Sequence, residues 1–170
     1  MSNEHFQLTQ VDALPDFHLH LVYADGQTFT IDMKPWINKS KHLLALKDPA
    51  LFAQAKLGFI NRSVEWIEDT LELASDNLRN YAIEQAGGIG HERIWNWLHN
   101  NQFTLEQGAK ALGISRRMLI YYRDGEKPIP RHIWLACLAS EALRFDSKII
   151  TDNLPFHLPM SHHQSTGITA

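Results

Sequence analysis

The chain of 170 residues is 44% hydrophobic and 21% charged, with a formal net charge of −3. These values exclude a disordered chain, and neither a leader-like N-terminus nor an apolar run long enough for a membrane span is found. The single cysteine, Cys137, cannot form an intramolecular disulfide and is expected to be a small buried hydrophobe. We therefore expect a cytoplasmic protein that has no membrane partner.

Charge is divided unevenly along the chain. Residues 1–86 contain seven Lys or Arg against twelve Asp or Glu, whereas residues 87–147 contain eight against six. Such a separation is expected when one end of a protein contacts phosphates and the other does not. The change coincides with Gly87-Gly88-Ile89-Gly90, where three glycines in four residues interrupt regular structure. We predict a first domain over 1–86, a second over 87–152 and a C-terminal tail over 153–170.

The first domain is predicted to be a small α+β unit, an antiparallel sheet of four or five strands with helices on one face. Apolar residues alternate over 17–23 and again over 28–32, and Asp25-Gly26 between them favours a hairpin turn. Three further elements are expected: a short helix from Pro49 through Ala55 capped by Asp48, a strand pair over 56–69, and a helix beginning at Ser75.

Several different short motifs lie in this half of the chain. They are Leu14-Pro15-Asp16, the Asp25-Gly26 hairpin, Asp32-Met33-Lys34-Pro35, the segment 46–52 and Val64-Glu65-Trp66. Together they resemble, over roughly residues 11–80, a bacterial family known only as a domain of unknown function, DUF2442. The motifs are turns, strand ends and helix starts, so the resemblance implies a fold and no activity.

The second domain is predicted to be all helical. Thr104 is placed to cap a helix and Gln107, three residues later, completes a capping box. Asp124-Gly125 ends the helix that follows. The first three expected helices cover 91–100, 104–112 and 116–123. The fourth begins at Pro130 and includes Ala142.

The turn between the second and third helices carries the most specific pattern. Ala109 lets two helices approach closely, Gly113 can adopt the left-handed backbone of a tight turn, and Ser115 can cap the next helix. With Asp124-Gly125 and a proline-containing loop at matching spacing, the stretch over 91–145 resembles the Cro and phage-repressor family, the lambda repressor-like helix-turn-helix proteins.

That resemblance implies binding to duplex DNA. In such domains the third helix enters the major groove and the second crosses the backbone. Arginine can bind guanine in a bidentate manner, and apolar side chains can contact a thymine methyl. We expect Arg116, Arg117 and Tyr121 to face bases, with Met118 and Ile120 beside them. The remaining candidate DNA contacts are Thr104, Ser115 and Lys127, and of these Thr104 and Lys127 are candidate phosphate contacts. For Lys127, a solvated loop position fits as well as a phosphate contact.

We therefore predict a sequence-specific DNA-binding protein, a transcriptional regulator that acts as a homodimer and whose first domain dimerises or binds a protein partner. The alternative is a protein-interaction or antitoxin-like module, which Leu105 and the weak basic surplus support and Arg116 and Arg117 oppose. Leu105 stands where the family often has a phosphate-binding glutamine, and the unusually apolar third helix fits a protein interface as readily as a groove. Gly108 also departs from the family, since it replaces a bulky apolar residue and lowers helix propensity without an obvious return.

No catalytic, cofactor or metal motif stands out, and we expect a protein that is not an enzyme and binds no cofactor. His18 and His20 share one face of a strand, but they lack the further ligands that a metal site needs, so a solvated face is the simpler interpretation. They are also the only support for a nucleic-acid enzyme. The histidines of the tail are metal-capable by composition, although a flexible tail is the simpler interpretation: His157, His162 and His163.

Overall fold

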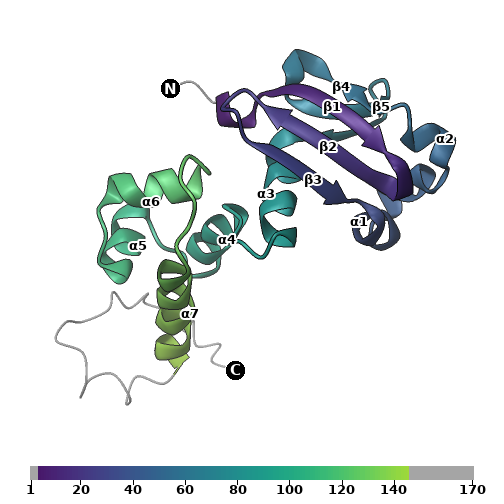
Figure 1. The fold of residues 1–170 in the computed structure, drawn as a ribbon. Coiled ribbons are helices and arrows are strands. Elements are labelled where there is room, and N and C mark those ends of the chain that lie inside the picture. The colour runs from purple at the N-terminus through teal and green to yellow at the C-terminus, as the bar shows by residue number, and fades with distance from the viewer. Residues whose placement is uncertain (1–3, 146–170) are drawn as a thin grey trace, which may run out of the picture. The chain divides into compact units, whose positions relative to one another are not determined.

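The chain forms two compact units, Met1–Gly90 and His91–Ala170, of which the computed structural model describes residues 4–145 (Figure 1). The expected tail over 153–170, with its three histidines, lies outside the described residues. The N-terminal unit contains two small antiparallel sheets and short helices, and the C-terminal unit is all helical. This confirms the predicted fold class. Within residues 4–145, no helix has the length and apolar character needed to cross a bilayer.

The first sheet contains β1 (Leu8–Leu14), β2 (His18–Tyr23) and β3 (Thr28–Asp32), which lie side by side in that order (Figure 1). The predicted hairpin is confirmed, because β2 and β3 pair antiparallel from His18 opposite Asp32 to Val22 opposite Thr28. Alternate residues of β2 are buried, as expected for a strand with one face in the core: Leu19, Leu21 and Tyr23.

Strand β1 was not expected from the sequence. Its pairing with β2 shifts register between Leu8 and Gln10, which marks an irregularity of the β-bulge type. A bulge places neighbouring residues on the same face, and here both Thr9 and Gln10 are exposed. The period-two pattern that would predict the strand is therefore lost.

The second sheet contains β4 (Lys56–Leu57), β5 (Ser63–Ile67) and β6 (Leu71–Ala74). The pair β4 and β5 confirms the strand pair predicted over 56–69, and β6 adds a strand that was not predicted. The expectation of four or five strands in one sheet was thus wrong, since the described residues form six strands in two sheets.

The helices of the N-terminal unit are short except for the last. Asp48 caps α2 as predicted, its carboxylate accepting a hydrogen bond from the Ala50 amide at 2.9 Å. The helix ends before Ala55, because the following amides bond three residues back and tighten the chain into turns. The α-helices are α1 (Lys34–Lys39), α2 (Pro49–Phe52) and α3 (Ser75–Gln85), and the 3₁₀ segments are η1 (Glu4–Phe6), η2 (Pro15–Phe17), η3 (Lys41–Lys47) and η4 (Phe59–Asn61).

One hydrophobic core joins the two sheets to the helices of this unit. Leu19 of the first sheet, Val64 of the second and Leu78 of α3 are all fully buried in it. The Trp66 indole, also buried, donates a hydrogen bond to the Phe52 carbonyl at 3.0 Å and so ties the second sheet to α2. The two sheets and the helices of this unit therefore bury their apolar faces in one shared core.

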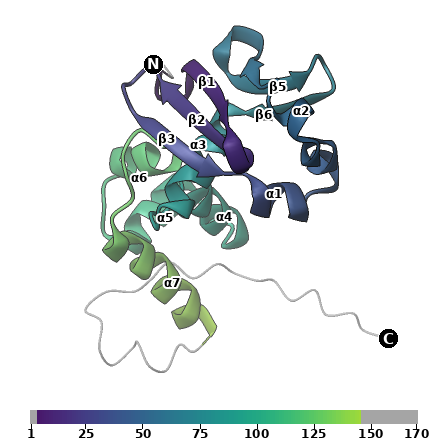
Figure 2. The same cartoon turned by 45° about the vertical axis from the view of Figure 1, so that its right-hand side comes forward.

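The C-terminal unit contains α4 (Glu92–Asn100), α5 (Leu105–Leu112), α6 (Arg116–Arg123) and α7 (Arg131–Phe145), close to the four predicted helices (Figure 2). Trp97 of α4 is buried, and its indole donates to the Cys137 carbonyl and to Ser140 Oγ, both at 3.1 Å. Burial raises the pKa of the Cys137 thiol to about 12, so this side chain acts as a small hydrophobe.

Candidate nucleic-acid interface

The start of α5 is fixed by the predicted capping box. Thr104 Oγ1 accepts a hydrogen bond from the Gln107 amide at 3.2 Å, and Gln107 Oε1 accepts one from the Thr104 amide at 2.9 Å. Two amides that would otherwise lack partners at the helix start are thus satisfied. The Thr104 hydroxyl still has its own hydrogen to donate, so its capping role is compatible with a phosphate contact.

The turn from α5 to α6 is a Schellman motif. Gly113 has φ 65° and ψ 29°, its amide bonds to the Lys110 carbonyl at 3.2 Å, and the Ile114 amide bonds to the Ala109 carbonyl at 3.0 Å. Ser115 Oγ then accepts a hydrogen bond from the Met118 amide at 3.2 Å. The turn and cap predicted from Gly113 and Ser115 are confirmed, and they fix the direction in which α6 begins.

Gly108 is explained by the packing around α5. A Cβ atom at this position would lie 2.6 Å from Leu98 Cδ2, 3.1 Å from Leu119 Cδ2 and 3.2 Å from Trp97 Cζ3. The glycine therefore lets α5 approach α4 and α6 closely. The sequence shows the cost of Gly108 in helix propensity but no obvious return, and the structure supplies that return as close packing between helices.

Helix α6 turns one face inward and the other toward solvent. Leu119 and Tyr122 are buried, three positions apart, so the opposite face is centred on Arg117. Arg116 and Arg117 are exposed, whereas the predicted neighbours Met118, Ile120 and Tyr121 are half-buried. The helix thus presents two cations and the edges of three apolar or aromatic side chains.

Tyr121 holds two cations on the solvent side of α6. Arg117 Nε donates a hydrogen bond to the Tyr121 hydroxyl at 2.5 Å, and its guanidinium carbon lies 5.4 Å from the ring centroid. The Lys127 ammonium lies 5.0 Å from the same centroid. Cations at this distance are attracted by the ring. We call Arg117, Tyr121 and Lys127 the Tyr121 cluster.

The loop after α6 brings Lys127 into this cluster. The amides of Glu126 and Lys127 both bond to the Tyr121 carbonyl, at 2.9 and 3.2 Å, and fold the loop back over the end of the helix. Sequence spacing alone left Lys127 as a loop residue with two equally compatible interpretations. Its contact with the Tyr121 ring now places its charge beside that of Arg117.

Arg116 is oriented by a residue that sequence reasoning missed. Its Nε lies 2.6 Å from Glu106 Oε1 on α5, and the side chains of the pair are 55% and 67% exposed. Exposed ion pairs of this kind contribute less than about 1 kcal/mol, so Arg116 can leave the carboxylate for another partner at little cost. The pairing bridges two helices, and no spacing rule within one helix would have found it.

The histidines considered in the first unit make local hydrogen bonds. His18 Nδ1 lies 3.0 Å from the Asp16 carbonyl, and His20 Nδ1 lies 3.1 Å from Thr30 Oγ1. Among residues 4–145, no group of three or more His, Cys, Asp or Glu side chains is arranged to hold a metal ion. The predicted contact residues lie in the C-terminal unit: on α6, at the N-terminal caps of α5 and α6, and in the loop that follows α6.

Comparison with solved structures finds a protein from Nitrosomonas europaea ATCC 19718 whose crystal structure is described as that of "Putative DNA Binding Protein NE0471". The two chains are 41% identical with a TM-score of 0.77, and the match covers 93% of this chain and 99% of the other. No family model matches the chain, which leaves the resemblances to DUF2442 and to the lambda repressor-like proteins unconfirmed, and no curated protein matches it either. The identity and coverage show that the chain belongs to the same family as NE0471 of Nitrosomonas europaea.

Proposed function

We propose that this protein is a sequence-specific DNA-binding protein that inserts α6 into the major groove, as lambda repressor-like helix-turn-helix domains do. The observation that carries the proposal is the Tyr121 cluster, which holds two cations on the exposed face of α6. The description of the Nitrosomonas europaea relative as a DNA-binding protein supports the same assignment.

Each exposed residue then has a defined role. Arg117 and Arg116 contact base edges, and a bidentate contact to guanine contributes about 1 to 3 kcal/mol of discrimination. Met118, Ile120 and the Tyr121 ring contact apolar base edges such as thymine methyls. The phosphate contacts, which position the domain without selecting a sequence, come from Thr104, Ser115 and Lys127.

The regulator is proposed to act as a cytoplasmic homodimer and to have no enzymatic activity. Two copies of α6 would occupy half-sites one helical turn apart, about 34 to 36 Å. We assign DNA binding to a domain over 87–152 and dimerisation or partner binding to the acidic domain over 1–86. Residues 1–86 carry seven basic and twelve acidic side chains, and this excess of negative charge disfavours contact with phosphates.

A protein-interaction module is the alternative, and it has specific support. Trp95 on α4 is 53% exposed, with the Arg123 guanidinium 5.1 Å from its ring centroid. Glu106, on α5, and Glu126, next to Lys127, reduce the positive charge around α6. Exposed aromatic and apolar side chains fit a protein partner, including an antitoxin-like role, as well as a groove.

The test is selection from a randomised duplex pool with the full chain, at two salt concentrations. We expect a near-palindromic site to be enriched and the enrichment to be lost in an Arg116→Ala, Arg117→Ala double variant. The Lys39→Ala variant, which removes an exposed cation from the N-terminal unit, is the control and should behave as the parent. Failure to enrich any site would contradict the proposal and favour the protein-interaction alternative.

A further inference from the structure

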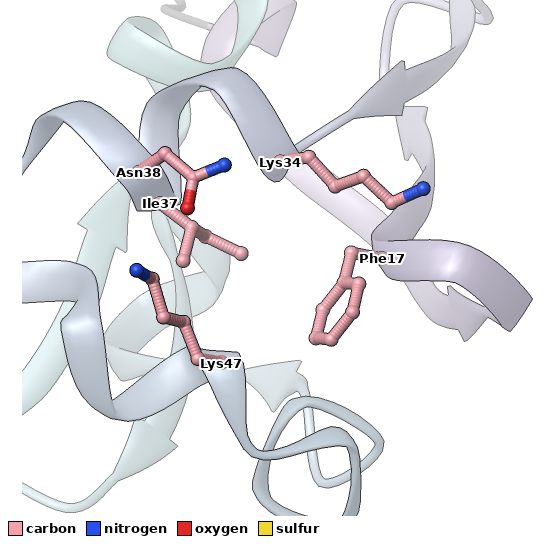
Figure 3. Close-up of a pocket in the computed structure, with 5 residues that line it drawn as sticks. All are labelled: Phe17, Lys34, Ile37, Asn38 and Lys47. Atoms are coloured by element: carbon pink, nitrogen blue, oxygen red, sulfur yellow. The ribbon is translucent and has the colours of Figure 1, made fainter.

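A small pocket in the N-terminal unit has an apolar interior and a cationic rim. It has a volume of about 220 Å³ and is lined by Phe17, Lys34, Ile37, Asn38 and Lys47. Figure 3 shows Phe17 and Ile37 with Lys34 and Lys47 on opposite sides of them, and the two ammonium groups point away from each other. The pocket therefore offers an aromatic and an aliphatic surface, with a lysine side chain at each end and one amide.

Two lysines of this acidic unit, Lys34 and Lys47, line the pocket, and they begin and end a segment that carries no acidic residue. Residues 34–47 contain four lysines and no Asp or Glu, although residues 1–86 carry only seven basic residues against twelve acidic ones. Lys47 is exposed and forms no ion pair within the described part of the chain. Such a local reversal of charge in an acidic domain favours an anionic ligand.

The backbone at the pocket edge adopts a conformation that is costly for Phe17. Asp16 and Phe17 have φ values of 63° and 59°, in the left-handed region that favours glycine. The turn places the Phe17 ring at the pocket, 5.3 Å from the Phe52 ring in an edge-to-face arrangement. It also pairs the Asp16 carboxylate with Lys34. Residues held in such conformations cluster at ligand sites.

We propose that this pocket binds a small organic anion, a carboxylate or phosphate carried on a flat apolar body. The apolar body packs on Phe17 and Ile37, and binding requires the Lys34 and Lys47 side chains to turn their ammonium groups toward the anion, to which the Asn38 amide donates a hydrogen bond. The volume is below the range of about 300 to 1,000 Å³ typical of drug-sized ligands, so the ligand is compact. Asp16 competes with it for Lys34.

The test is an NMR titration of the isotope-labelled full chain with benzoate and with phenyl phosphate. Benzamide serves as the uncharged analogue and inorganic phosphate as the anion without a ring. We expect saturable shifts at the amides of Phe17, Ile37 and Asn38 with at least one of the two aromatic anions, and much weaker binding of both controls. Equal binding of either control, or no saturable shift with either aromatic anion, would overturn the proposal.

Three variants locate the site. Lys47→Gln should weaken binding about tenfold, the loss expected for one charge-assisted contact, while Lys41→Gln, outside the pocket, should leave it unchanged. Asp16→Asn should tighten binding several-fold, because asparagine tolerates the left-handed backbone and releases Lys34. Equal losses of affinity in Lys47→Gln and Lys41→Gln would indicate non-specific attraction to positive charge and would contradict the proposed site. The titration contains no DNA, so its outcome is independent of the proposed function.

Discussion

Arg79 brings a positive charge into the interior of the N-terminal unit. Its side chain is 9% exposed, and its Nη2 lies 2.7 Å from Asp25 Oδ2 while Nη1 donates to the His5 carbonyl at 2.6 Å. The guanidinium also lies over the Tyr23 ring, 4.9 Å from its centroid. One residue of α3 thereby fixes both the N-terminal segment and the hairpin turn, an arrangement that joins parts of the chain more than fifty residues apart.

The pair of Arg79 and Asp25 makes stability depend on pH. Burial raises the pKa of the Asp25 carboxyl, but hydrogen bonds from Arg79 and the Gln27 amide and the charge of Arg79 outweigh it and leave the pKa below its usual 3.8. A carboxyl whose pKa is depressed on folding stabilises the protein fully above its unfolded pKa, about 3.9, and this contribution is lost as the pH falls through the folded value.

We therefore expect the free energy of unfolding to fall less steeply between about pH 5 and pH 3 in Asp25→Asn than in the parent chain. Denaturant titrations at a series of pH values measure this slope. Arg79→Met should lose the part of this pH dependence that Arg79 supplies, while the bond from the Gln27 amide to Asp25 remains. It should also be less stable at pH 7, because it removes the guanidinium that donates to the His5 carbonyl and to Asp25. An unchanged slope in both variants would contradict the assigned role of the pair.

At the scale of elements, the close packing of α5 on its neighbours predicts an unusual response to alanine. Alanine in place of glycine normally stabilises a helix by about 1 kcal/mol. In Gly108→Ala the new Cβ would meet three buried side chains, and overpacking of this kind costs about 1 to 3 kcal/mol. We expect a net loss of about 1 kcal/mol in the free energy of unfolding, measured by chemical denaturation.

A double-variant cycle separates this packing effect from helix propensity. Leu98→Val removes the Cδ2 atom that comes closest to the new Cβ, so the loss from Gly108→Ala should be smaller in that background. Additive effects of the two changes would mean that the contact with Leu98 is not responsible. A gain of stability in Gly108→Ala alone would show that the helices separate at little cost.

The elements that the sequence predicts are those specified by neighbouring residues. The capping box of Thr104, the left-handed Gly113 and the cap of Ser115 are each determined within a few positions, and they define α5, its turn and the start of α6. Strand β1 was missed because a register shift hides its alternation, and β6 because four residues carry little pattern. The division into two sheets depends on pairings that local patterns do not encode.

The same limit applies to the candidate interface. The exposed residues of α6 follow from its period and its two buried positions, Leu119 and Tyr122. The pairing of Arg116 with Glu106, and the contact of Lys127 with the Tyr121 ring, instead require the packed helices and the folded loop. A sequence therefore predicts which residues are presented, whereas the orientation of their charges depends on tertiary structure.

For the whole molecule, net charge and local charge oppose each other. The chain carries −3 overall, because the −5 of residues 1–86 exceeds the +2 of residues 87–147, so long-range attraction to DNA is weak. Binding must then depend on the few cations near α6, and raising the salt concentration should weaken it in proportion to the phosphates they neutralise. The logarithm of the association constant should fall linearly with the logarithm of salt, with a small slope for a DNA-binding protein.

Lys127→Gln should reduce that slope by about one and weaken all duplex sequences alike, because a phosphate contact carries no sequence preference. Arg117→Ala should instead change the order of preferred sequences, since its loss removes a base contact. Fluorescence anisotropy with the selected site and a scrambled duplex, over a range of salt concentrations, distinguishes the two effects. Lys39→Gln, in the N-terminal unit, is the control. If Lys127→Gln matches it, Lys127 contacts no phosphate and its proposed role in DNA binding is wrong.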